Sequence, residues 1–177
     1  MKRRMQRGWA ACAVGLVAVV AGAAGAGAQE PAATPAAQPG KPLATEEHEV
    51  GEVEVTLLEL KRTSGNTVTM KWQYENKSNE VKPLFSRSGV YPQDPYMLAV
   101  EAYIVDPANK KKYLVIEDAK GVPVAAKHKE GKDADIEVEP GKTLKTWAKY
   151  PAPPASVDKV TVYIAGIAPL EDVPLAP

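Results

Sequence analysis

Cysteine is almost absent from this sequence, which has 177 residues and a single thiol at Cys12. That cysteine lies near the start of an apolar stretch that we expect to be removed from the mature protein. A lipoprotein cysteine would sit at the far end of such a stretch, directly at the cleavage point, so lipid anchoring is not predicted. A mature chain without any thiol excludes disulfide bonds, cysteine nucleophiles and thiolate metal sites.

Histidine is nearly as scarce, with His48 and His128 far apart in the sequence. Imidazole metal sites need several grouped histidines, and a serine nucleophile needs a base within hydrogen-bonding reach. The sequence therefore predicts neither a metal centre nor a catalytic triad, and we expect no cofactor. Four alternating acids could offer oxygen ligands to calcium, but their spacing is typical of the solvent face of a strand. They are Asp133, Asp135, Glu137 and Glu139.

An excess of either charge is also missing, since 22 lysines and arginines balance 22 acids. Four of the basic residues and none of the acids lie in the segment expected to be removed, so the mature protein is mildly acidic. Nucleic-acid binding requires clustered lysines and arginines that neutralise phosphates, and we expect no nucleic-acid partner. The lysine-rich runs at 110–112 and 127–129 are interpreted as solvated turns.

The first 28 residues have the three-part order of a signal peptide. A basic start (1–7) is followed by an apolar stretch (9–20) and by small residues that end at residue 28. This pattern predicts export with cleavage before Gln29. An uncleaved membrane anchor is the alternative, but the Ala/Gly-rich second half is poorly hydrophobic for a span of about 20 residues. We expect an extracytoplasmic protein, periplasmic or secreted, with no membrane span after cleavage.

Residues 29–48 differ in composition from both flanking regions. Four prolines lie among alanines here, and few side chains could be buried, so we predict a disordered, extended linker. Residues 49–177 have the length of one ordinary domain. The predicted organisation is therefore a signal peptide, a linker and one folded domain.

Alternating apolar and polar residues mark the first two strands of the domain. Between Val53 and Leu60 the apolar phase slips by one residue after Leu57, which predicts a β-bulge. A turn at 64–66 follows, and residues 68–74 then alternate cleanly. The two strands are predicted to form a hairpin with one buried face.

Further short strands follow along the chain. Residues 97–105 are apolar on both phases and predict a central strand, and residues 113–117, 143–150 and 157–165 predict later ones. About seven strands separated by turn signals, with no helix-period stretch, predict an all-β fold, an immunoglobulin-like antiparallel β-sandwich. A closed barrel is the alternative.

Several segments of the chain resemble those of a known protein family. They are Asp106-Pro107, Lys112-Tyr113-Leu114, Glu117-Asp118, Pro140-Gly141, Trp147-Ala148 and Tyr150-Pro151-Ala152-Pro153-Pro154. In this order they resemble a family of secreted bacterial immunoglobulin-like domains of unknown function, found alone or beside envelope modules such as the peptidoglycan-binding domain of OmpA-type proteins. The resemblance covers residues 50–175. It implies the sandwich fold and the extracytoplasmic location, and it carries over no catalytic residues.

The segment from Glu80 to Pro95 is the candidate site. Loops of about 15 residues without periodicity are uncommon unless they are functional or disordered. We predict that any specific contact with a partner or ligand involves the aromatic and basic side chains of this region. They are Phe85, Arg87, Tyr91 and Tyr96. The alternative is that the apolar residues of the segment close one end of the sandwich.

Two tryptophans lie within the predicted domain. Trp72 shares its phase with apolar neighbours, which predicts core packing. Trp147 shares its phase with Thr143, Lys145 and Lys149, which predicts a polar face that carries one exposed or half-covered ring.

The function predicted from these features is a non-enzymatic module of the cell envelope. It would bind or scaffold another envelope protein or a small ligand. A small secreted hydrolase with paired carboxylates is one alternative, because its two acids can come from anywhere in a chain. A purely structural domain is the other.

Overall fold

The computed structural model describes residues 41–85, 94–128 and 136–177. The predicted signal peptide and most of the predicted linker lie outside these residues. Within them the fold is mostly β, with antiparallel sheets and one helical turn, which confirms the predicted all-β class. No helix formed by the described residues is long and apolar enough to cross a membrane.

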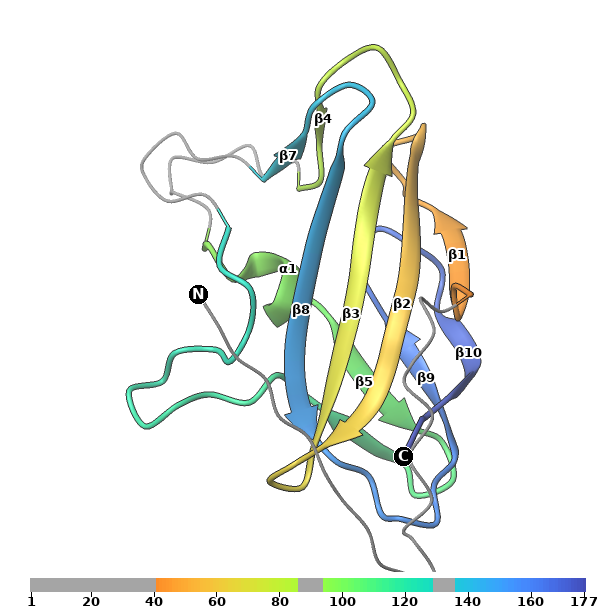
Figure 1. Cartoon of the computed structure of the whole chain (residues 1–177), viewed down its shortest axis with the longest axis vertical. Coiled ribbons are helices and arrows are strands. Elements are labelled where there is room, and N and C mark those ends of the chain that lie inside the picture. Colours follow the sequence, from red (N-terminus) through yellow and green to blue (C-terminus); the bar gives the residue numbers. More distant parts are fainter. Residues whose placement is uncertain (1–40, 86–93, 129–135) are drawn as a thin grey trace, which may run out of the picture. The chain divides into compact units, whose positions relative to one another are not determined.

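The first sheet consists of four strands, β1 (Ala44–Glu47), β2 (Val53–Thr63), β3 (Thr67–Asn76) and β8 (Thr143–Pro151). They pair antiparallel in the order β1-β2-β3-β8 (Figure 1). Side chains alternate between the two faces of a strand, and the apolar phase of β2 and β3 faces the core.

The predicted hairpin of the first sheet is present, together with its bulge. The register between β2 and β3 shifts between Leu57 and Glu59, so Leu58 is the extra residue of β2. The connecting turn has positive φ angles at Gly65 (76°) and Asn66 (55°). Glycine and asparagine tolerate this conformation, which explains why the turn forms at this point of the sequence.

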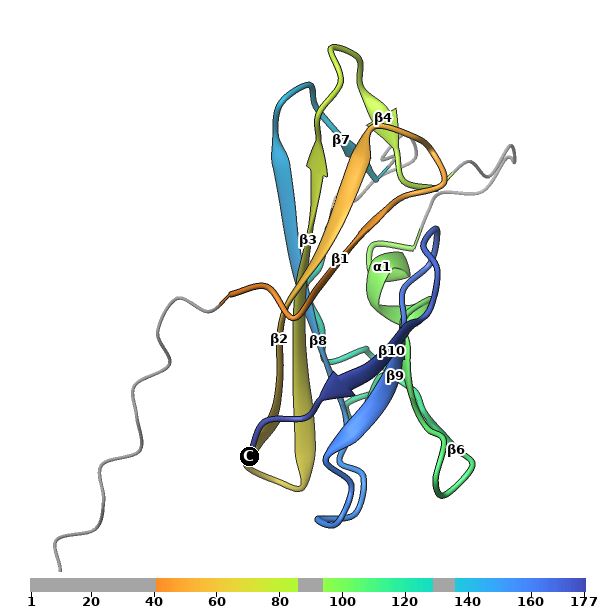
Figure 2. The same cartoon turned by 90° about the vertical axis from the view of Figure 1, so that its right-hand side faces the viewer.

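The second sheet consists of β5 (Tyr103–Asp106), β6 (Lys111–Tyr113), β9 (Lys159–Tyr163) and β10 (Leu170–Pro174). Its strands pair antiparallel in the order β10-β9-β5-β6. Figure 2 shows the two four-stranded sheets as facing layers. A small ribbon is formed by β4 (Lys82–Pro83) and β7 (Glu137–Val138).

Both four-stranded sheets contribute to one buried cluster. Trp72, Tyr74 and Tyr150 from the first sheet meet Ile104 and Val162 from the second, and none of the five is more than 1% exposed. The Trp72 indole N–H donates to the Tyr74 hydroxyl at 3.1 Å, so its polar atom is satisfied inside the core. The core position predicted for Trp72 is confirmed.

Two strand predictions need correction at the edges of the fold. The linker was expected to reach residue 48, but residues 44–47 form β1, because their backbone pairs along β2. The strand β10 was not predicted, because a register shift between Leu170 and Val173 breaks its alternation. Asp172 lies in this shift with a positive φ of 52°.

A third correction concerns residues 97–105, which were predicted as one strand. The first part is a helical turn, α1 (Met97–Val100), and only Tyr103–Asp106 is a strand. Met97, Leu98 and Ala99 are buried in the helical turn. A run that is apolar on both phases fits a buried helical turn as well as a buried strand, so the pattern could not separate the two.

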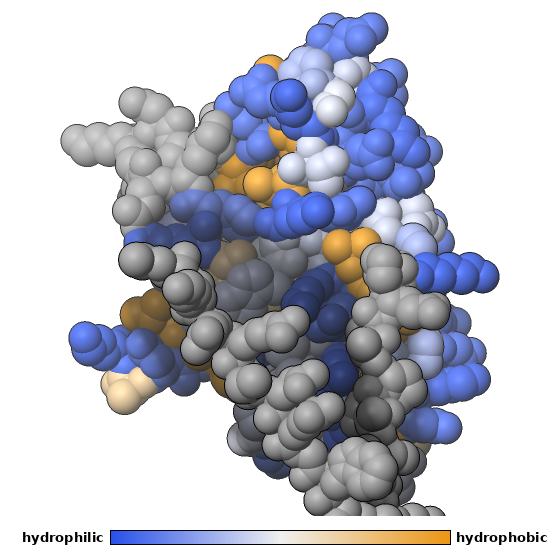
Figure 3. All heavy atoms as spheres, viewed as in Figure 1, coloured by the Kyte–Doolittle hydropathy of each residue, from blue (hydrophilic) through white to orange (hydrophobic). Residues whose placement is uncertain are grey.

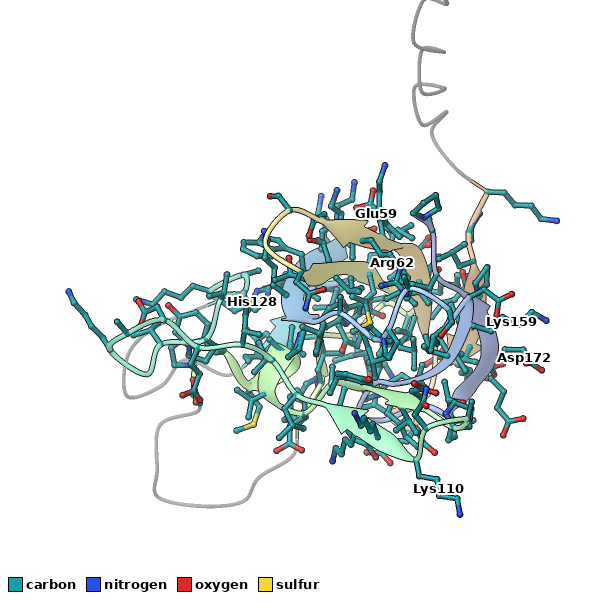
Figure 4. All side chains as sticks on the ribbon, turned by 90° about the horizontal axis from the view of Figure 1, so that it is seen from below. Glu59, Arg62, Lys110, His128, Lys159 and Asp172 are labelled. Carbon is teal, nitrogen blue, oxygen red and sulfur yellow. The ribbon has the colours of Figure 1, made fainter. Side chains whose placement is uncertain are left out.

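Arg62 ties the proline-rich connection between β8 and β9 to the first sheet. Its guanidinium donates to the carbonyls of Pro153 (2.7 Å), Pro154 (2.8 Å) and Val157 (2.9 Å). Figure 4 shows Arg62 on the inner side of the first sheet and Glu59 on its outer side. The planar fork of donors suits several carbonyls at once, so one side chain fixes the crossover between the sheets.

Candidate functional site

The two ends of the described domain meet at a half-open apolar groove, which we call the terminal groove. It has a volume of about 520 Å³. Its lining comes from Lys41 and Leu43, from residues 58–61 of β2 and from residues 174–177 at the C-terminus. Three segments that are distant in the sequence therefore form one surface.

Backbone pairing along the edge of β2 creates the terminal groove. The chain leading into β1 covers the first half of this edge, where the Leu43 N–H donates to the Leu57 carbonyl at 2.9 Å. The C-terminal chain covers the second half, where the Ala176 N–H donates to the Leu60 carbonyl at 3.0 Å. The bulge at Leu58 lies between the two, and the groove opens there.

Four leucines contribute apolar side chains to the lining of the groove. Leu60 and Leu175 are buried, Leu58 is half-buried and Leu43 is 36% exposed. Covering such apolar surface is favourable by about 25 cal/mol per Å². Binding of a ligand whose apolar part covers the groove is therefore favourable.

The rim of the terminal groove carries Lys41, Lys61 and Glu59. Glu59 pairs with Lys71 at 3.0 Å, so its charge is partly balanced from outside the groove. The described residues that line the groove include no histidine, serine or threonine. This lining offers apolar contacts and charged groups to a ligand.

A second groove of about 450 Å³, the acidic groove, lies at the turn between β1 and β2. Lys77 pairs with Glu54 at 2.6 Å and Lys82 pairs with Glu52 at 3.1 Å. Exposed ion pairs of this kind contribute little to stability. No group of three or more His, Cys, Asp or Glu side chains placed to hold a metal ion occurs among the described residues. The acidic groove is lined by Thr45, Glu46, Glu47, Glu52, Val53, Glu54 and Lys77.

His48 joins the turn before β2 to the connection between β9 and β10. It is 3% exposed, and its Nδ1 accepts the Val50 N–H at 3.2 Å. The ring lies edge-on to Tyr74, with 6.0 Å between ring centroids, and the Glu49 N–H donates to the Gly166 carbonyl at 2.7 Å. Burial lowers the pKa of His48, and the Glu49 charge opposes this only in part. The sequence placed His48 in or beside the linker, whereas it belongs to the folded domain.

The structure describes both ends of the predicted 80–95 site but not its middle. Phe85 is half-buried and packs against the core. Tyr96 is half-buried and precedes α1 as its N-cap residue. Arg87 and Tyr91 lie outside the described residues, so a contact surface made by all four side chains stays a prediction.

The described start of this segment closes one end of the core. Leu84 is 3% exposed, and its N–H donates to the Ile136 carbonyl at 2.9 Å beside the β4-β7 ribbon. This agrees with the alternative that apolar residues of the segment cover the end of the core. Val81 and Val100 are 43% exposed and lie outside this cover.

The sequence did not predict the terminal groove. The bulge after Leu57 was visible as a phase slip, but nothing local shows that the segments at Leu43 and Leu175 flank it. Backbone pairing of both termini with β2 brings them together. The one indication in the sequence was that Leu43 and Leu175, near each end of the domain, are apolar residues outside the predicted strands.

No match was found when the chain was compared with family models, with curated proteins and with solved structures. The resemblance to secreted bacterial immunoglobulin-like domains therefore stays a prediction. Function has to be inferred from the surfaces that the described residues form, among which the terminal groove offers an apolar contact surface.

Proposed function

We propose that the chain is a non-enzymatic, extracytoplasmic binding or scaffolding module of the cell envelope, which holds an apolar part of its ligand in the terminal groove. The observation that carries the proposal is the opening of this groove at the bulge in β2. Ligand sites are typically concave and mostly apolar, with a few charged or polar groups and volumes of about 300–1,000 Å³. Another envelope protein or a small ligand would suit this chemistry.

The strand order supports an immunoglobulin-like arrangement. In such domains one sheet has the order A-B-E-D and the other contains G-F-C. Here β2, β3 and β8 take the places of A, B and E, and a bridge between Ala125 and Ala148 takes the place of D. In the second sheet β10, β9 and β5 take the places of G, F and C, and β6 corresponds to the additional strand C′.

Export is supported by the basic, apolar and small-residue order of the first 28 residues. We expect the protein recovered from the periplasm or the medium to have the mass of residues 29–177, as measured by intact-protein mass spectrometry. A mass that retains residues 1–28 would contradict export with cleavage. A lipidated N-terminus would show that Cys12 had been misinterpreted.

Binding in the terminal groove can be tested with the dye 1-anilinonaphthalene-8-sulfonate, which fluoresces on apolar protein surface. Its aromatic rings suit the leucines, and its sulfonate suits the ammonium groups of Lys41 and Lys61. We expect saturable binding to the exported protein. The double variant Leu43→Gln, Leu58→Gln should bind roughly tenfold more weakly, because the groove loses apolar surface. Both leucines are partly exposed, so the variant should remain folded.

The matched control replaces two exposed valines that do not line the terminal groove, Val81→Gln with Val100→Gln. This variant removes a similar amount of exposed apolar surface and should leave the dye affinity unchanged. An equal loss in both variants would mean that the dye does not bind in the groove. Absence of saturable binding to the unmodified protein would favour the purely structural domain.

A further inference from the structure

The outer face of the first sheet collects lysines around one tryptophan. Side chains at alternate positions of a strand point to the same face. Residues 68, 70, 72 and 74 of β3 point inward, so Lys71 points outward. The same alternation on β8 directs Lys145, Trp147 and Lys149 outward, and Lys61 lies on this side of β2. We call these five residues the cationic face.

Cross-strand pairing brings the members of the cationic face together. Lys71 lies directly opposite Trp147, and Lys145 and Lys149 lie two residues away on either side of Trp147. Lys61 and Lys149 both pair with the same residue of β3. Strands in a sheet are about 4.8 Å apart, and residues two positions apart along a strand are separated by about 6.7 Å. Lys71, Lys145 and Lys149 are therefore the near neighbours of the tryptophan, and Lys61 lies two strands away on the same face.

The charge of this face is only partly compensated. Glu59 pairs with Lys71, but the Lys71 side chain is half exposed and that of Glu59 one-third exposed, so this ion pair is weak. Neither Lys145 nor Lys149 has a carboxylate of a described residue within ion-pair distance. Glu75 lies on the same face of β3, two residues beyond the partner of Lys145, so four lysines and two glutamates leave a local excess of positive charge on a domain whose mature chain is mildly acidic.

Trp147 is 38% exposed at the centre of this charge, as the sequence predicted. Figure 3 views this face and shows hydrophilic residues over much of the uncovered part of the first sheet. In Figure 4 nitrogen-tipped side chains project from the same side of the sheet as Glu59. An indole ring among lysines is the combination found at membrane–water interfaces, where the ring lies at headgroup level and ammonium groups meet phosphates.

We propose that the cationic face binds the surface of a membrane that contains anionic lipids. A flat sheet face fits a flat surface, and each lysine near an anionic bilayer contributes favourably. A soluble anionic glycan would instead be expected to lie along a groove, and neither groove is lined by Trp147, Lys145 or Lys149. The proposal does not depend on the ligand of the terminal groove.

Vesicle binding of the exported protein tests this proposal. We expect it to co-sediment with mixed phosphatidylglycerol and phosphatidylcholine vesicles, but not with phosphatidylcholine alone, and to be released by salt. Lys145→Gln with Lys149→Gln should weaken binding roughly 30-fold, since each lysine contributes about five- to sixfold. The control Lys110→Gln with Lys111→Gln alters two exposed lysines of the β5-β6 hairpin and should change binding less than threefold. Lys61 is left unchanged because it also lines the terminal groove, so this test can fail independently of the dye test.

Tryptophan emission provides a second measurement on the same samples. Trp72 is 0% exposed, so a blue shift on adding anionic vesicles reports on Trp147, and Trp147→Phe should abolish it. The proposal is overturned by equal binding to neutral vesicles, by equal loss in both lysine variants, or by vesicle binding without a blue shift. Binding to soluble dextran sulfate without binding to vesicles would also overturn it, in favour of an anionic polymer.

Discussion

Replacing Gly166 by alanine is expected to destabilise the domain by about 3 kcal/mol or more. Gly166 has a φ of +81°, which is unfavourable for any residue with a Cβ. A Cβ placed there would also lie within 3.0 Å of three ring atoms of His48. Because His48 is buried against Tyr74 and bonded to Val50, it cannot move without disturbing the turn before β2. The free energy of unfolding in urea measures the cost.

Two companion variants separate backbone strain from the clash with His48. Gly65 has nearly the same φ, 76°, but nothing lies within 4 Å of its added Cβ, so Gly65→Ala should cost only about 1 kcal/mol. In a His48→Ala background the Gly166→Ala change should also cost only about 1 kcal/mol, because the obstructing ring is gone. A full cost in that background would show that the contact with His48 is not the cause.

Replacing Asn76 by leucine is expected to cost about 4 kcal/mol, because four hydrogen bonds of one buried side chain are lost at once. Asn76 is 0% exposed. Its Nδ2 donates to the carbonyls of Glu80 (2.7 Å) and Val138 (2.8 Å). Its Oδ1 accepts the N–H (2.9 Å) and the hydroxyl (2.7 Å) of Ser78. Leucine has a similar size but offers neither a donor nor an acceptor to these groups in the interior.

Asn76→Asp gives this prediction a pH signature. The new carboxylate keeps both bonds from Ser78 but turns an oxygen toward the carbonyls of Glu80 and Val138. Its neutral form can donate one hydrogen bond, so folding favours that form and the folded-state pKa of the new acid is raised. The folded state then binds more protons than the unfolded state, and the stability of this variant should rise as pH falls from 7 toward 5.

Asn79→Leu, at an exposed position of the same loop, should change stability by less than about 0.5 kcal/mol at either pH. A cost below about 1 kcal/mol for Asn76→Leu would refute the role given to this network.

The network around Asn76 also holds the end of β3 to the short β4-β7 ribbon. The carbonyl of Val138 belongs to β7, and the Asn76 backbone N–H donates to the Lys142 carbonyl at 3.0 Å. One side chain and its own backbone therefore fix the end of β3 to the β7-β8 connection. Polar side chains that satisfy buried backbone groups in this way specify one arrangement, because any other arrangement leaves the same groups unpaired.

Features of the domain that depend on neighbouring residues could be predicted from the sequence. The hairpin of β2 and β3 follows from period-two alternation, and the bulge follows from the phase slip after Leu57. The Pro140-Gly141 turn is present, with a φ of +63° at Gly141 and a hydrogen bond from the Lys142 N–H to the Glu139 carbonyl at 3.0 Å. The buried position of Trp72 and the exposed position of Trp147 follow from the same alternation. In each case residues that are close together in the sequence determine the conformation.

The tertiary structure alone decided which distant residues share a surface. The terminal groove depends on β1 and the C-terminal chain meeting the two halves of one edge of β2, and the cationic face depends on the register among β2, β3 and β8. A shift of one residue in that register would send every side chain of a strand to the opposite face. The packing of His48 against Gly166 likewise joins turns that are far apart in the sequence. Alternation tells which side chains of a strand share a face, but only pairing and packing decide which strands lie beside each other, and both surfaces depend on that choice.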